Sequence, residues 1–219
     1  MMRRTIVLLA TVALTLLVAS GVALAVTKIG TDGPDRLRGT NEADNLLGKG
    51  GNDLLFALGG RDTLLGGEGK DWLFGGSFER PFGGHKSFVG GPGNDGLQGG
   101  NDADDAVGGE GNDLLYGHTG ADRLVGGEGD DLLFSGPYRE TAMDTLSGGD
   151  GNDVLFFDNR IPAKDVVTCG DGFDRVGADR KDVVAPDCEQ VFVGAAASRF
   201  YSRLEESGFF DRFFEELAQ

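Results

Sequence analysis

Residues 108–131 read GGEGNDLLYGHTGADRLVGGEGDD, and this stretch decides the fold. A glycine-rich hexapeptide that ends at Asp113 is followed by the apolar triplet Leu114–Tyr116, and the same pattern returns at Asp131. Between them, Asp122 ends a looser version of the unit. Glycine adopts positive φ angles without steric cost, which suits a tight turn, and three residues make a short strand. The stretch therefore predicts alternating turns and strands with a nine-residue period.

This nine-residue period extends over most of the chain. Aspartate recurs every nine residues from Asp35 to Asp71 and again from Asp95 to Asp131, and an aliphatic residue stands two places after almost every one of them. A single unit buries only one leucine, so many units must stack before a core exists. The pattern predicts an all-β repeat protein over residues 26–193.

Alternate units fall into two sets. In the first set glycine precedes each aspartate by two residues, and the spacing is 18 residues except for intervals of 24, 22 and 21. The second set is degenerate, with GTNEAD at 39–44 and GHTGAD at 117–122, and it contains the extra residues near 75–89, 135–147 and 157–168. We call the turns of the first set the regular edge and those of the second set the insertion edge.

The regular units resemble the haemolysin-type, or RTX, calcium-binding nonapeptide repeat, whose consensus is GGxGxDxUx. The near copies are GGEGKD at 66–71, GGPGND at 90–95, GGEGND at 108–113, GGEGDD at 126–131 and GGDGND at 148–153. The resemblance covers about residues 30 to 190. It implies a parallel β-roll, a right-handed β-solenoid in which two nonapeptides form one coil, with calcium ions between successive turns of one edge.

Calcium prefers six to eight hard oxygen ligands from carboxylates and backbone carbonyls, and glycine leaves its carbonyl uncovered. The expected ligands are Asp35, Asp53, Gly66, Gly69, Asp71, Gly90, Gly93, Asp95, Gly108, Gly111, Asp113, Gly126, Gly129, Asp131, Gly148, Gly151, Asp153 and Asp174. Eight regular turns leave at most seven gaps for ions. The alternative is that these aspartates only cap turns, but stacked carboxylates repel one another without a cation. Pro34, Lys49, Cys169 and Phe173 depart from the consensus, and the sequence leaves calcium on the insertion edge open.

Composition argues against several other functions. The net charge is −16, with 36 acidic and 20 basic residues, and so acidic a surface repels nucleic acid. The chain contains no HExxH motif or phosphate-binding loop. Its two histidines, His85 and His118, are expected to be solvated loop residues, so the sequence does not predict an enzyme.

The N-terminus and the cysteines both point to export. Residues 1–25 have the three parts of a signal peptide, with Arg3 and Arg4, an apolar run, and the cleavage sequence Ala23–Ala25. An uncleaved anchor helix is the alternative. In the mature chain we expect no membrane span, and we expect a secreted or cell-surface location. In an oxidising compartment Cys169 and Cys188 should form a disulfide.

Two apolar features lie outside the turns. Outward strand positions carry an aromatic strip, consisting of Phe56, Phe74, Tyr116, Phe134 and Phe156. Residues 194–219 predict a short helical tail, with Phe209, Phe213 and Leu217 on one face. The tail could cap the roll, pack on the strip, or dock a partner.

The function predicted is a secreted, calcium-stabilised β-roll. The alternative is an adhesion or surface-assembly protein that binds a cell-surface partner, or itself, through the strip or the insertion loops.

Overall fold

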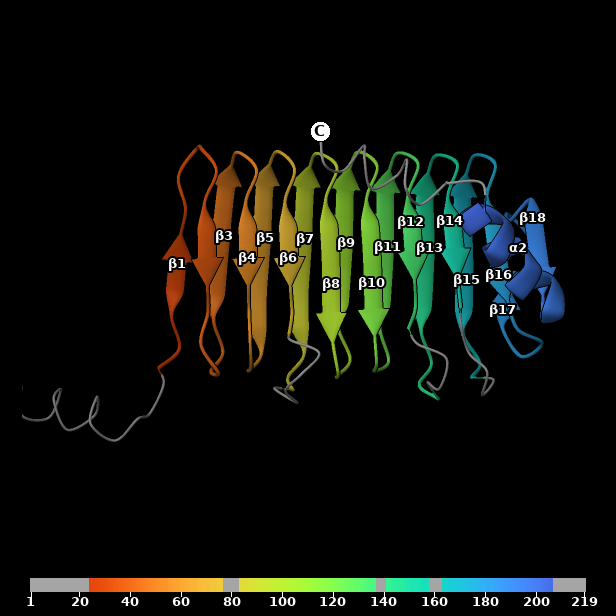
Figure 1. Ribbon diagram of the computed structural model, residues 1–219, viewed down its shortest axis with the longest axis horizontal. Coiled ribbons are helices and arrows are strands. Elements are labelled where there is room, and N and C mark those ends of the chain that lie inside the picture. Colours follow the sequence, from red (N-terminus) through yellow and green to blue (C-terminus); the bar gives the residue numbers. More distant parts are fainter. Residues whose placement is uncertain (1–23, 77–82, 137–140, 158–162, 207–219) are drawn as a thin grey trace, which may run out of the picture.

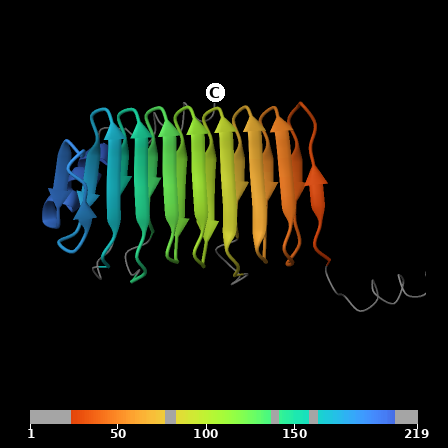
Figure 2. The same cartoon turned by 180° about the vertical axis from the view of Figure 1, so that it is seen from behind.

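The fold consists of two nine-stranded parallel sheets that face each other along the length of the chain (Figure 1). The structure is a computed structural model, and it describes residues 24–76, 83–136, 141–157 and 163–206. Odd-numbered strands form one sheet and even-numbered strands the other. Figure 2 shows the odd-numbered sheet in front. Residues 1–23 of the predicted signal peptide lie outside the described residues.

The strands follow one another in the order of the repeats. The first sheet contains β1 (Thr27–Ile29), β3 (Asn45–Gly50), β5 (Asp62–Glu68), β7 (Lys86–Pro92), β9 (Asp105–Glu110), β11 (Arg123–Glu128), β13 (Thr145–Asp150), β15 (Val166–Asp171) and β17 (Val183–Val184). The second contains β2 (Arg36–Arg38), β4 (Leu54–Phe56), β6 (Trp72–Phe74), β8 (Gly96–Gly100), β10 (Leu114–His118), β12 (Leu132–Phe134), β14 (Val154–Phe156), β16 (Arg175–Ala178) and β18 (Gln190–Val193). The regular edge joins each odd strand to the next even strand, and the insertion edge joins each even strand to the next odd one.

The core is a double row of aliphatic side chains between the sheets. Leu115 pairs in register with Leu97 and with Leu133, so the middle residue of each even strand lies directly beside its neighbours. Leu46, Leu64 and the corresponding residues of the odd strands form the opposing row, and both rows are buried. Side chains of a strand alternate between its two faces. In a three-residue strand, only the middle side chain therefore points into the core. The predicted parallel β-roll is confirmed.

The aromatic strip lies on the outer face of the even-numbered sheet, but it is divided. Phe56 stacks on Phe74 with ring centroids 5.1 Å apart, and Tyr116, Phe134 and Phe156 form a second group. Gln98 of β8 pairs in register with Phe74 and Tyr116. A polar side chain therefore interrupts the ladder that the sequence predicts.

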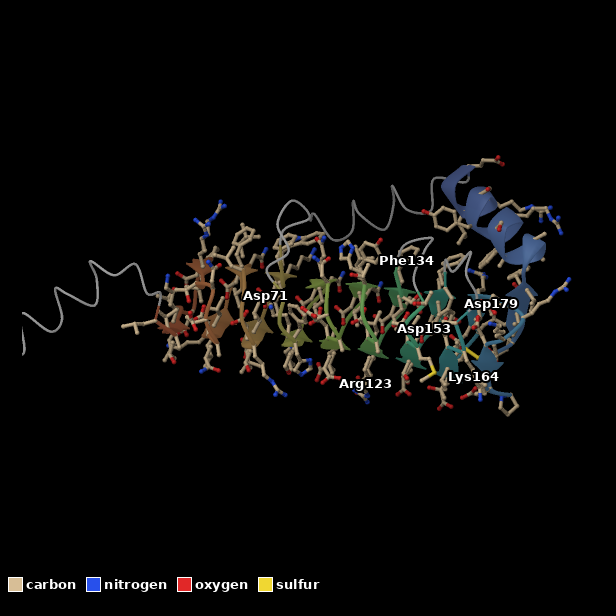
Figure 3. All side chains as sticks on the ribbon, turned by 90° about the horizontal axis from the view of Figure 1, so that it is seen from below. Asp71, Arg123, Phe134, Asp153, Lys164 and Asp179 are labelled. Carbon is tan, nitrogen blue, oxygen red and sulfur yellow. A yellow bond between two sulfur atoms is a disulfide. The ribbon has the colours of Figure 1, made fainter. Side chains whose placement is uncertain are left out.

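The described part of the tail is helix α2 (Ala195–Glu206), and it packs on one end of this strip. Phe200 stacks on Phe156 at 5.2 Å, and the ring of Tyr201 meets Phe156 edge-on at 5.3 Å. In Figure 3 the helix lies on the same side of the roll as Phe134, whereas Arg123 projects from the opposite sheet. The predicted helical tail is confirmed over α2, while Phe209, Phe213 and Leu217 lie outside the described residues.

Candidate metal centre

The regular edge buries the aspartate that ends each turn. Asp71, Asp95, Asp113 and Asp153 are completely buried, as is Asp174, while Asp35 at the open end is half-buried. Figure 3 shows Asp71 and Asp153 between the two sheets rather than on the outer face. The side chains point inward because the aspartate stands two residues before an inward leucine, and alternate residues of a strand share a face.

One carboxylate oxygen of each aspartate joins neighbouring coils. The backbone N–H of Asp95 donates to Oδ1 of Asp113 at 2.7 Å, and that of Asp113 donates to Oδ1 of Asp131 at 2.8 Å. The same bond repeats without interruption from Asp35 to Asp174. At the end of the row, the N–H of Asp174 donates instead to Oε2 of Glu189 at 2.9 Å. This aspartate ladder gives the side chains a structural role before any ligand is considered.

The second carboxylate oxygen is different. Within the described residues, Oδ2 is buried without a hydrogen-bond donor in seven aspartates of the regular edge. They are Asp53, Asp71, Asp95, Asp113, Asp131, Asp153 and Asp174. A buried ionised carboxylate normally has donors or a counter-charge at both oxygens, because desolvating it is costly. Each of these turns therefore presents an uncompensated negative oxygen.

Burial also raises the pKa values of these carboxyl groups. Desolvation is the largest cause and repulsion by neighbouring aspartates adds to it, while the backbone hydrogen bond of the ladder acts in the opposite direction. The pKa of Asp71 rises to about 6, of Asp95 to about 7, of Asp113 to about 8 and of Asp131 to about 9. Toward the C-terminal end the pKa of Asp153 is about 7. Without a cation, the middle of the edge resists full ionisation near neutral pH.

Backbone carbonyls lie beside these oxygens. From Asp53 to Asp174, the glycine two residues before each aspartate of the regular edge has positive φ, 144° at Gly93 and 118° at Gly111. A Cβ atom on Gly111 would overlap the carbonyl oxygen of Gly93, and one on Gly108 would overlap Oδ2 of Asp113. The glycines thus keep carbonyl and carboxylate oxygens of successive turns close together. Lys49 occupies a glycine position with φ of 89°, so this departure from the consensus costs strain without breaking the roll.

No group of three or more His, Cys, Asp or Glu side chains converges among the described residues. A metal ion at the regular edge would therefore depend on backbone carbonyls together with one or two carboxylates. Calcium accepts this type of ligand set, whereas zinc takes Cys, His and carboxylate side chains. The hard, uncompensated oxygens of the regular edge therefore fit calcium.

The insertion edge carries an aspartate ladder of its own, which the sequence analysis followed as far as Asp122 but not on to Asp144 and Asp165. The N–H of Asp104 donates to Oδ1 of Asp122 at 2.8 Å, and the row continues through Asp144 and Asp165 toward Asp182. Asp144 follows Asp122 by 22 residues and Asp165 follows Asp144 by 21, the same irregular intervals as on the regular edge. These shared intervals could have identified Asp144 and Asp165 from the sequence. The two edges therefore differ in their glycines, their insertions and one charged residue, rather than in whether aspartates are present.

That residue is Lys86, which falls among the inserted residues near 75–89 of the sequence. Lys86 begins β7 and pairs in register with Asp62, which is an aspartate-ladder position. It is buried, and its ammonium group lies 3.4 Å from Oδ2 of Asp62. The available signal was its spacing, because Lys86 precedes Asp104 by 18 residues.

The expectation that both histidines are solvated is wrong for His118. Its side chain is buried, with 8% of the residue exposed, and it lies against Tyr116 with ring centroids 3.8 Å apart. Nε2 is 2.7 Å from Nε2 of Gln98, and burial lowers the pKa of His118 to about 4. It fills the space beside the interrupted strip. His85 is half-buried, with Nδ1 2.5 Å from the carbonyl oxygen of Ala103.

The predicted disulfide is present. Cys169 and Cys188 are bonded, with Cα atoms 5.2 Å apart. Cys169 stands five residues before Asp174, where the other regular turns have their first glycine. The bond therefore closes the regular edge at the coil where the aspartate ladder ends on Glu189.

The paired parallel sheets, the nine-residue turns and the buried aspartate rows define a calcium-binding type of β-roll. A protein family described as RTX calcium-binding nonapeptide repeat (4 copies) matches residues 29–64, 47–78, 87–115, 98–133 and 143–159. The chain belongs to this family. A comparison with curated proteins finds no match. Among the described residues, no helix combines the length and apolar character needed to cross a bilayer.

Proposed function

We propose that this protein is an exported calcium-binding β-roll whose folding is coupled to calcium, with the ions held at the regular edge. The observation that carries the proposal is the row of seven buried aspartate Oδ2 atoms without a hydrogen-bond donor. Each lies beside turn glycines whose carbonyls approach the next coil.

The ligands would come from two kinds of group. The carboxylates are those of Asp53, Asp71, Asp95, Asp113, Asp131, Asp153 and Asp174, with Asp35 at the more exposed end. The carbonyls are those of the turn glycines, Gly66, Gly69, Gly90, Gly93, Gly108, Gly111, Gly126, Gly129, Gly148 and Gly151. A calcium ion bound there supplies the positive charge that these buried carboxylates lack.

Coupling to folding follows from where the ligands lie. Each gap is made by turns of two successive coils, so a site exists only after both coils have formed. A ligand that binds only the folded state stabilises that state by mass action. Low calcium therefore favours the unfolded chain inside the cell, and higher calcium outside favours the roll.

Two features support export. Residues 1–25 have the pattern of a signal peptide, and the Cys169–Cys188 disulfide is typical of proteins in oxidising compartments. The proposed role is structural and calcium-binding, and it includes no catalytic step.

A second candidate function is adhesion or surface assembly. Helix α2 packs on Phe134 and Phe156, whereas Phe56, Trp72 and Phe74 at the other end of the strip stay half-buried. Such an apolar surface suits a partner or a second copy of the chain. Light scattering of the calcium-loaded protein tests self-association, and Trp72→Ser should abolish any dimer while leaving the calcium requirement unchanged.

The test of the main proposal is a titration of the mature chain with calcium, followed by far-ultraviolet circular dichroism. We expect a cooperative gain of β-structure that a chelator reverses and that magnesium does not reproduce. A β-spectrum that is unchanged by chelator would contradict the proposal, because the aspartates would then act as turn caps alone.

A further inference from the structure

Lys86 occupies a position that otherwise belongs to acidic side chains. The insertion-edge ladder places aspartate at this step in the coils before and after it, at Asp62 and Asp104. The N–H of Lys86 donates to Oδ1 of Asp104 at 2.7 Å, as an aspartate would. The N–H of Asp62 has no Asp oxygen to receive it and donates instead to the carbonyl of His85, at 3.3 Å. Lys86 therefore substitutes for a ladder aspartate without breaking the coil.

The ammonium group of Lys86 lies among oxygen atoms of two turns. It donates to the carbonyl oxygens of Gly60 and Gly84, both at 2.6 Å, and lies 3.4 Å from Oδ2 of Asp62. The two carbonyls use two of its three donors, and the contact with Asp62 is an ion pair. Only 2% of Lys86 is exposed, and burial of a lysine is tolerated when its charge is paired and its donors are used.

The same types of oxygen line the gaps of the regular edge. Gly60 and Gly84 each stand two residues before a ladder residue, Asp62 and Lys86. Gly93 and Gly111 hold the equivalent places before Asp95 and Asp113. A carboxylate oxygen and carbonyls from two successive turns are hard ligands for calcium. In the gap next to Lys86 these oxygens already surround a positive charge.

We propose that the Lys86 ammonium is a tethered cation that takes the place of a calcium ion between the Asp62 and Lys86 turns. This inference rests on the proposed calcium function of the regular edge and extends it to the opposite edge. The gap beside Lys86 then needs no metal. The chain carries its own counter-charge next to the coil where the largest insertion interrupts the repeat.

Two variants test the substitution. Lys86→Asp restores the ladder residue and removes the ammonium, so it should bind one more calcium ion than the wild-type chain by native mass spectrometry. Lys164→Asp is the matched control, because Lys164 is an exposed lysine of the same edge, and its calcium count should not change. A Lys86→Asp chain that binds the wild-type number of ions, or that does not fold at saturating calcium, overturns the proposal.

Lys86→Met keeps the stem and removes the charge. At a calcium concentration just sufficient to fold the wild-type chain, this variant should melt lower by roughly 10 °C, because an unpaired buried carboxylate remains. Lys164→Met should melt as the wild type does. An unchanged melting temperature in Lys86→Met contradicts the tethered-cation role.

The two ideas fail separately. If the wild-type chain keeps its β-spectrum in chelator, the proposed calcium function is refuted. The melting temperatures of Lys86→Met and the wild-type chain are then compared in that buffer. A wild-type chain that folds with calcium, together with a Lys86→Asp variant that gains no ion, removes only the tethered cation.

Discussion

The two edges of this roll are built on the same kind of aspartate ladder, but they differ in the counter-charge available to a buried carboxylate. On the regular edge, turn glycines keep carbonyls close to seven buried carboxylate oxygens that lack a donor. On the insertion edge, Oδ2 of Asp104 is likewise buried without a hydrogen-bond donor, whereas Asp62 is paired with the ammonium of Lys86. A row of buried carboxylates can therefore be kept folded by an external ion or by a side chain of the same protein.

The largest expected effect comes from pH, because it acts on the whole regular edge. The pKa values of Asp71, Asp95, Asp113 and Asp131 rise from 3.8 to between about 6 and about 9. A raised folded-state pKa gives stability that is present below the unfolded pKa and lost as pH rises through the folded one. The cation-free roll should therefore lose stability from about pH 4 to about pH 9.

Calcium should replace the compensation that protons give at low pH. Protons and the ion neutralise the same carboxylates in the folded roll, whereas the unfolded chain is already ionised above about pH 4, so the calcium concentration at the folding midpoint should rise as pH rises from about 6 to about 9. Calcium titrations followed by circular dichroism at several pH values measure this midpoint. On the insertion edge Asp104 has a pKa of about 6, with the charges of Lys86 and His85 opposing the shift. A midpoint that falls as pH rises would contradict the raised pKa values of these carboxylates.

A pair of glycine substitutions next compares a tight turn position of the regular edge with an open position of the insertion edge. Gly111→Ala places a side chain at φ 118° and against the carbonyl of Gly93, and should cost about 3 kcal/mol of unfolding free energy. Gly100→Ala on the insertion edge meets only Oδ2 of Asp104, at 3.8 Å, and should change stability by less than about 0.5 kcal/mol. Chemical denaturation in calcium measures both. Equal losses would show that the turns are equally tight.

The disulfide should matter at one end only. Replacing Cys169 and Cys188 by serine should cost about 3 kcal/mol, the chain-entropy value for a loop of 19 residues. The loss should appear as faster hydrogen exchange in β15 to β18, with β3 to β6 unchanged. Uniformly faster exchange would indicate that the roll unfolds as one unit.

The smallest effect compares single carboxylates. Asp113→Asn keeps Oδ1 as an acceptor for the N–H of Asp95 and removes a charge whose pKa is about 8. It should weaken calcium binding about tenfold, or ~1.4 kcal/mol, while slightly stabilising the cation-free chain above about pH 8. Asp104→Asn should weaken binding less. Calorimetric titration measures both, and equal losses of affinity would refute the difference between the edges.

The repeat period made much of this fold predictable. Each inward leucine, such as Leu55 or Leu115, follows its aspartate by two residues, so the pattern is local and can be read directly from the sequence. The parallel sheets, the regular edge and the disulfide all follow from such spacings. The aromatic strip was also predicted, but not its interruption at Gln98, because the sequence reasoning did not assign an outward residue to β8.

The errors lie where a contact joins distant segments. The role of Lys86 could not be read from the sequence, because the oxygens that its ammonium contacts include the carbonyls of Gly60 and Gly84, which carry no side-chain signal. His118 occupies a turn position, yet its positive φ of 75° is compatible with burial beside Tyr116 and Gln98. A helix and an apolar strip could each be read from the sequence, whereas the stacking of Phe200 on Phe156 could not.

The most direct test of the central claim is to locate the ions. Crystals of the mature chain grown in calcium, with diffraction recorded at long wavelength, give an anomalous difference map in which calcium appears as discrete peaks. The account predicts a row of peaks between successive turns of the regular edge and no peak in the gap filled by Lys86. A map without peaks along the regular edge, or with a peak beside the Lys86 ammonium, would contradict it.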